Sequence, residues 1–67
     1  MNDMTECVDT LNRMSDRIEG IGYILAALYK TECTNKYSLG VIGHQLLEVE
    51  ETIDNAVEFL RKQADAG

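Results

Sequence analysis

The sequence contains no proline and no tryptophan, and only three tyrosines and one phenylalanine make up its aromatic content. Proline interrupts helices because it lacks an N–H donor, so its absence removes the strongest helix breaker. No run approaches the about 20 apolar residues that a membrane-spanning helix needs. Residues 1–6 are acidic, unlike the basic start of a signal peptide. We therefore expect a cytoplasmic protein with no membrane segment.

Cysteine and basic residues are also scarce. Cys7 and Cys33 are too few for a disulfide framework, and both are expected to be reduced in the cytoplasm. Twelve acidic residues outweigh six basic ones, which gives a formal net charge of −6. Such a chain repels nucleic acid, whose binding draws on neutralisation of phosphates by Lys and Arg. We expect no nucleic-acid partner, although a dimer that pairs Arg13 and Arg17 is an alternative way to bind DNA.

Two long series of apolar residues at helical spacing dominate the rest of the chain. The first runs from Met4 to Leu28 and the second from Leu39 to Leu60, with steps that alternate between three and four residues. This is the a/d pattern of packed helices, and the two-residue alternation of a strand is missing. The spacing predicts two amphipathic helices.

Polar residues mark the expected helix ends. Asp3 followed by Glu6 resembles a capping box, and a polar segment separates the two apolar series. Within that segment, both Asn35 and Ser38 are candidate caps for the second helix. The sequence predicts one all-α domain over residues 1–67, with a helix over about 3–32, a turn over about 33–38 and a helix over about 39–64.

A short turn between two long helices favours an antiparallel hairpin. If the chain folds back near Asn35, facing apolar residues have numbers that add to 70 or 71, as Leu28 and Ile42 do. Every apolar layer of one helix then finds an apolar partner on the other. The sequence therefore predicts a register as well as a fold.

An isolated hairpin would bury too little apolar surface for its chain length. Further apolar residues lie off the two series and would stay in water. We expect them to join two hairpins into a homodimeric four-helix bundle, or to dock the hairpin on a larger partner. The residues predicted for the dimer interface are Val8, Ile24, Leu47, Val57 and Phe59.

Four glycines interrupt the predicted helices, at positions 20, 22, 40 and 43. Each costs about 1 kcal/mol relative to Ala in a helix interior. One explanation is close backbone approach between the packed helices, or a bend at residues 20–22. The other is a groove floor where a side chain of another chain enters.

No motif identifies a catalytic chemistry or a cofactor site. The single histidine, His44, lies on the second helix near the end of the hairpin opposite Cys7, so a nucleophile and a base do not meet. His44, Glu48 and Glu51 share one helix face, but the predicted packing turns that face to solvent. The inward pairing of Glu and His that bundle metal sites use is missing. We expect neither an enzyme nor a cofactor.

A row of carboxylates on the second helix is the most marked electrostatic feature. It either keeps the protein soluble or docks a basic partner, and in the second case it can imitate nucleic-acid phosphates. Two tyrosines flank the turn, where they either cover the hairpin end or anchor an interface. The candidate partner-binding residues are Glu48, Glu51, Asp54, Glu58, Tyr29 and Tyr37.

These features together predict a small, acidic, non-enzymatic interaction or regulatory protein that acts as a homodimer and binds another protein. Three alternatives stay open. The first is an acidic inhibitor that mimics nucleic acid toward a DNA- or RNA-binding protein, as phage or mobile-element proteins do. The second is a secretion-type co-chaperone, which rests on an analogy of fold alone. The third is a dimeric DNA-binding regulator.

Overall fold

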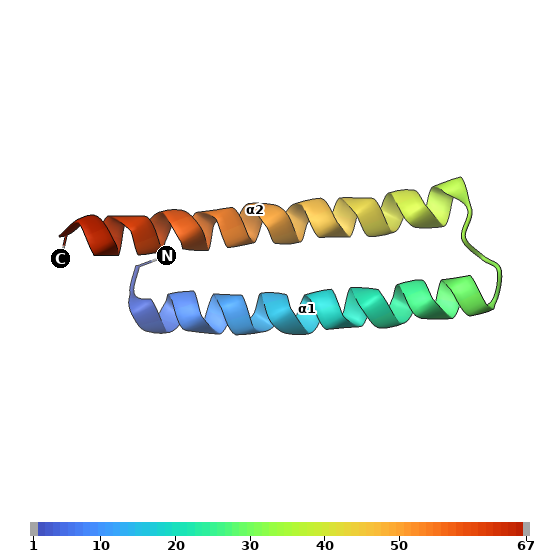
Figure 1. Ribbon diagram of the computed structural model, residues 1–67, viewed down its shortest axis with the longest axis horizontal. Coiled ribbons are helices and arrows are strands. Elements are labelled where there is room, and N and C mark those ends of the chain that lie inside the picture. The colour runs from blue at the N-terminus through green and yellow to red at the C-terminus, as the bar shows by residue number, and fades with distance from the viewer. Residues whose placement is uncertain (1, 67) are drawn as a thin grey trace.

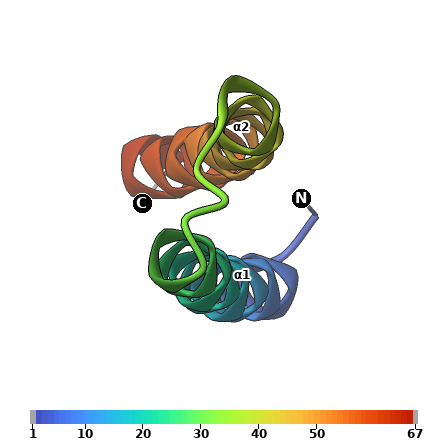
Figure 2. The ribbon, with the colours of Figure 1, turned by 90° about the vertical axis from the view of Figure 1, so that its right-hand side faces the viewer.

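The chain folds into two helices joined by a short turn, and the computed structural model describes residues 2–66. Helix α1 spans Met4–Lys30 and helix α2 spans Lys36–Ala66. The helices are antiparallel and lie side by side, with the turn at one end (Figures 1 and 2). The hairpin measures 51 × 17 × 14 Å. The two-helix, all-α hairpin predicted from the heptad spacing is confirmed.

Helix α1 begins at the predicted capping residue. Asp3 has an extended backbone, and its Oδ1 accepts a hydrogen bond of 2.8 Å from the backbone N–H of Glu6. The Glu6 carboxylate in turn accepts one of 3.0 Å from the backbone N–H of Asn2. The first bond satisfies an N–H group that the first helical turn leaves unpaired, and the second ties the residue before the cap to that turn.

Helix α1 ends in a Schellman motif, which the sequence did not predict. The N–H of Cys33 donates to the carbonyl of Leu28 at 2.9 Å, and the N–H of Glu32 donates to that of Tyr29 at 3.2 Å. Glu32 has a φ of 57°, in the left-handed region where this motif usually places glycine. The motif ends the helix at Lys30, about two residues before the predicted end.

Helix α2 begins with a reciprocal pair of hydrogen bonds between the two candidate caps. Asn35 Oδ1 accepts from the N–H of Ser38 at 2.9 Å, and Ser38 Oγ accepts from the N–H of Asn35 at 3.1 Å. This is the bonding pattern of a capping box. The helix therefore starts at Lys36, three residues before the predicted start.

The turn is centred on residue 33 rather than 35, and this shifts the register of the hairpin. Lys30 and Lys36 flank the turn, and their numbers add to 66. Arg17 Nη2 and Glu48 Oε2, from opposite helices, lie 2.9 Å apart, and these residue numbers add to 65. The predicted register of 70 or 71 is wrong by about five residues, which is more than one helical turn. The polar segment contains several residues that can end or start a helix, and the sequence alone did not choose among them.

The core between the helices is small. The buried apolar residues are Cys7, Ile42, Val49 and Ala56, and Thr10 is buried beside them. Cysteine, threonine and alanine contribute little apolar area, so the contact between α1 and α2 is narrow. Both cysteines are free, with Cys7 buried and Cys33 exposed in the turn.

The four glycines do not serve the packing of α1 on α2. A Cβ atom added at Gly20, Gly22, Gly40 or Gly43 would meet nothing within 4 Å. Close backbone approach within the hairpin is therefore the wrong explanation for them. The alternative, a groove floor that receives a side chain from another chain, stays a prediction.

Replacement of the α2 cap tests how this helix starts. We expect Asn35→Ala to lower the free energy of unfolding by about 1 kcal/mol, because the N–H of Ser38 loses its side-chain acceptor. The measurement is urea denaturation followed by circular dichroism at one fixed protein concentration. Thr34→Ala, at the adjacent exposed position, is the control and should change the free energy little. Equal losses in the two variants would contradict the cap.

Candidate interaction surface

Each helix buries one row of side chains and leaves the neighbouring row partly exposed. Thr10 of α1 and Val49 of α2 belong to the buried rows. Successive residues on a helix are turned by about 100°. The residues that follow the buried ones, Leu11 in α1 and Glu50 in α2, therefore lie beside the contact rather than within it.

These neighbouring rows are nearly free of charge. In α1 the row contains no charged residue and consists of Met4, Val8, Leu11, Ser15, Ile18, Gly22, Leu25 and Tyr29. In α2 the row contains one charged residue and consists of Leu39, Gly43, Leu46, Glu50, Ile53, Val57, Leu60 and Ala64. We call the two rows together the apolar face.

Both rows of the apolar face lie on the same side of the hairpin. On each helix, the residues of the apolar face directly follow the buried residues in the sequence, so they are turned from the buried row by the same right-handed rotation of about 100°. Because the helices run in opposite directions, these rotations have opposite senses when seen from one end of the hairpin. They therefore turn both rows toward the same side. The apolar face thus runs along the length of the hairpin on one side only.

The large side chains of the apolar face are about half-exposed. Apart from Tyr29, which is 77% exposed, the exposed large side chains on this face range from 38% at Leu60 to 48% at Met4 and Val8. Leu11 and Ile53 have intermediate burial. A long, continuous strip of this kind is a common sign of an interaction surface in a small protein.

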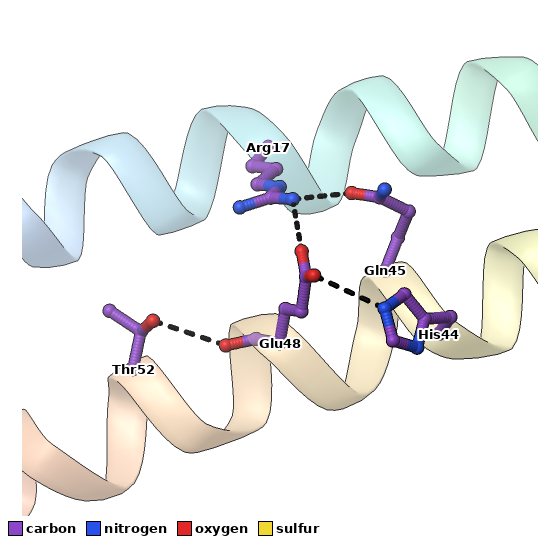
Figure 3. Close-up of polar contacts among 5 residues, drawn as sticks. All are labelled: Arg17, His44, Gln45, Glu48 and Thr52. Atoms are coloured by element: carbon purple, nitrogen blue, oxygen red, sulfur yellow. Dashed lines mark hydrogen bonds and ion pairs between the residues drawn. The ribbon is translucent and has the colours of Figure 1, made fainter.

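The opposite flank of the helix contact is polar (Figure 3). Arg17 Nη2 donates hydrogen bonds across the hairpin to Gln45 Oε1 and to Glu48 Oε2. Glu48 Oε1 lies 3.3 Å from His44 Nε2. Thr52 Oγ1 donates to the backbone carbonyl of Glu48 at 3.1 Å. We call these five residues the Arg17 cluster, and it marks the polar side of the hairpin.

Sequence reasoning missed the Arg17 cluster because it depends on the register. In the predicted register Arg17 faces Ile53, too far along α2 to reach Gln45. In the observed register it faces Val49, and Gln45 and Glu48 both lie within about one helical turn before Val49 on α2. The sequence holds the charges, but their pairing follows from where the turn is centred.

The five residues predicted for a dimer interface do not gather on one surface. Val8 and Val57 lie on the apolar face. Ile24 and Phe59 fall in the rows that flank the polar side, where Ile24 is 56% exposed and Phe59 is partly buried. Leu47 lies on the outer surface of α2 and is 64% exposed. The half-exposed members of the two apolar series, which the sequence assigned to the core, make up much of the apolar face instead.

The four predicted partner-binding carboxylates are exposed, but two of them have cationic partners. Glu48 pairs with Arg17, and Glu58 Oε1 lies 3.5 Å from Lys62 Nζ. Among residues 2–66, Glu51 and Asp54 form no ion pair. The negative charge that is free to meet a partner is therefore smaller than the sequence suggests.

The two predicted tyrosine anchors are the most exposed aromatic residues at the turn end. Tyr29 is 77% exposed at the edge of the apolar face, and Tyr37 is 82% exposed on the outer surface of α2. Tyr37 also borders a shallow hollow over Gly40, which Val41 and His44 line further along the helix. The two tyrosines lie near the same end of the hairpin but on different surfaces.

The described residues hold no cluster of metal-ligating side chains. Over residues 2–66, no three His, Cys, Asp or Glu side chains converge as metal ligands would. Within the same residues, neither helix combines the length and the hydropathy needed to cross a membrane. Comparison of the chain with family models, curated proteins and solved structures found no match.

A double-mutant cycle on Arg17→Met and Glu48→Gln tests the ion pair across the hairpin. Both side chains are partly exposed, at 39% and 47%, so solvent screens the pair. We expect a coupling energy of about 0.2–1 kcal/mol in urea denaturation that falls in high salt. Arg13→Met is the control, because Arg13 bonds only within α1, to Thr10. A coupling between Arg13 and Glu48 as large as that of Arg17 would contradict the assignment.

Proposed function

We propose that the protein is a cytoplasmic, non-enzymatic interaction or regulatory protein that acts as a homodimer and presents the outer surfaces of its helices to another protein. The observation that carries this proposal is the half-exposed apolar face. A surface of this kind gains free energy when it leaves water, and no segment of the described chain covers it. The narrow core between α1 and α2 gives the single hairpin little stability of its own.

The total surface of the hairpin supports the same proposal. The chain exposes 5283 Å², whereas a folded monomer of 7.5 kDa exposes about 4,200 Å² by the usual scaling with mass. The excess is what an extended two-helix rod leaves in water. Association with a second chain removes such an excess without any change in the hairpin itself.

The outer surfaces suit a second partner of a different kind. The exposed carboxylates of α2 lie toward its C-terminal half, and the exposed Tyr37 lies at the turn end. These residues lie off the apolar face, so a homodimer would still present them. Tyr29, the other predicted anchor, ends the α1 row of the apolar face, and the homodimer would cover part of it. We assign the docking of the unidentified partner protein to these outer surfaces.

The alternatives receive less support from the geometry. A mimic of nucleic acid needs a row of free carboxylates, and two of the four candidates are paired with Arg17 and Lys62. A DNA-binding dimer built on Arg13 and Arg17 needs free guanidinium groups, and that of Arg17 is held by Glu48. The co-chaperone alternative has no specific contact in its favour.

Two adjacent leucines provide a matched test of the homodimer. Leu46 lies on the apolar face, whereas Leu47 lies on the outer surface of α2. We expect Leu46→Glu to raise the dimer Kd by roughly 100-fold or more, because each interface would then bury two unpaired carboxylates. Leu47→Glu should leave the Kd nearly unchanged. The measurement is sedimentation equilibrium of each variant over a wide concentration range.

The unmodified chain tests the homodimer directly, through its melting temperature at several protein concentrations. A dimer whose melting temperature rises with protein concentration is the expected result, since association stabilises the folded state by mass action. A folded monomer at every concentration would refute the proposed homodimer. Equal weakening by Leu46→Glu and Leu47→Glu would show that the apolar face is not the site of association.

A further inference from the structure

We propose that the apolar face seats a second copy of the chain, with α1 of one copy packed on α2 of the other and both turns at the same end of the bundle. This inference rests on the proposed homodimer and adds to it the pairing of the helices. The two-fold axis then runs parallel to the helices. Each helix has two antiparallel neighbours, one from its own chain and one from the second copy.

The surface that two chains must bury to form a compact dimer has the size of an obligate homodimer interface. Two separate chains expose twice 5283 Å², whereas a compact protein of twice 7.5 kDa exposes about 7,000 Å². The difference is roughly 3,500 Å² in total, within the range of obligate homodimers. An interface of this size has to run along most of the 51 Å hairpin, and the apolar face runs along its length.

Two of the four glycines lie on the apolar face, at positions 22 and 43. Neither has a neighbour within 4 Å of its missing Cβ, so the single hairpin has no use for them. Glycine costs about 1 kcal/mol in a helix interior, and a packing partner outside the chain accounts for that cost. On this face they mark a position where a helix of the second copy can approach closely.

The two-fold axis fixes the register in which the two rows of the apolar face pair. A rotation about an axis parallel to the helices leaves every residue at its own height along them. Residues of α1 and of α2 in the second copy therefore face each other in the register of the hairpin itself, where the numbers add to 65 or 66. Gly22 then lies level with Gly43 of the second copy, since these numbers add to 65. Two glycines that face each other allow the two helices to approach closely.

The single charge on the apolar face favours this pairing over its rival. In the rival dimer α1 packs on α1 and α2 on α2, and over the full row of α2 the facing numbers add to 103. Glu50 then faces Ile53 and lies within one helical turn of Glu50 in the second copy, so two carboxylates repel each other at short range. When α1 packs on α2, the two Glu50 side chains belong to diagonal helices and stay apart.

The exposed thiol of Cys33 reports on the pairing without any substitution. Cys7 is 1% exposed, so a maleimide spin label reacts with Cys33 in the turn. With both turns at one end, the two labels are separated by about the width of a four-helix bundle, roughly 20 Å. In the rival dimer they are separated by about the length of the hairpin, 51 Å. The measurement is pulsed electron paramagnetic resonance on the labelled dimer, with Cys33→Ser as the control for label at Cys7.

The short distance is the expected result. A distance near the hairpin length would overturn the proposed pairing and leave the homodimer intact. A monomeric labelled chain, when the unlabelled chain is also monomeric, would instead refute the proposed function. The two failures are therefore distinguishable.

A glycine substitution tests whether the apolar face is the seat of the second copy. We expect Gly22→Leu to raise the dimer Kd at least tenfold, because the added side chain pushes apart the two helices where the facing glycines let them approach. Gly20→Leu, two residues away and off the apolar face, gains the same helix propensity and should not raise the Kd. The milder pair Gly22→Ala and Gly20→Ala should show the same difference and serves if a leucine variant fails to fold. A Kd that is unchanged or lower for both substitutions at position 22 would overturn the proposed seat.

Discussion

The narrow contact between two helices is the constraint on which the rest of this structure depends. A helix that packs on one neighbour buries one row of side chains and leaves the adjacent row in water. Here the buried rows contain residues as small as Cys7, Thr10 and Ala56. The hairpin therefore has little interior, a rod-like shape and an excess of exposed apolar surface. The apolar face is exposed because each helix has one neighbour only and buries one row of side chains against it.

The two flanks of this contact differ in chemistry, so the hairpin has a polar side and an apolar face. On the polar side, Arg17, Gln45 and Glu48 bond across the helices and keep their contact with water. On the apolar face, the only charged residue of either row is Glu50. The polar bonds contribute little free energy at this exposure. Their larger effect is that only one flank is left for apolar association.

The sequence predicted the two helices better than the register between them. Heptad spacing identifies two antiparallel helices, because no other structure buries residues at steps of three and four. The register depends on where the turn lies. Glu32 ends α1 in the left-handed conformation, which usually belongs to glycine, so the sequence did not mark the start of the turn. The interface residues were chosen as those outside a fully buried seam. Among the described residues, α1 and α2 bury only four members of that seam, and half-exposed members of it make up much of the apolar face. Of the chosen set, just Val8 and Val57 lie on that face.

The turn end has a consequence for partner binding in the proposed dimer. Tyr37 of each chain lies off the apolar face and stays exposed there, and a two-fold axis parallel to the helices brings two such ends together. The assembly is then directional, with an aromatic pole at the turns and an acidic region toward the other end. A partner with two matching sites engages both chains at once, and its second contact benefits from a high effective concentration. Weak individual contacts at the tyrosines then suffice for avid binding.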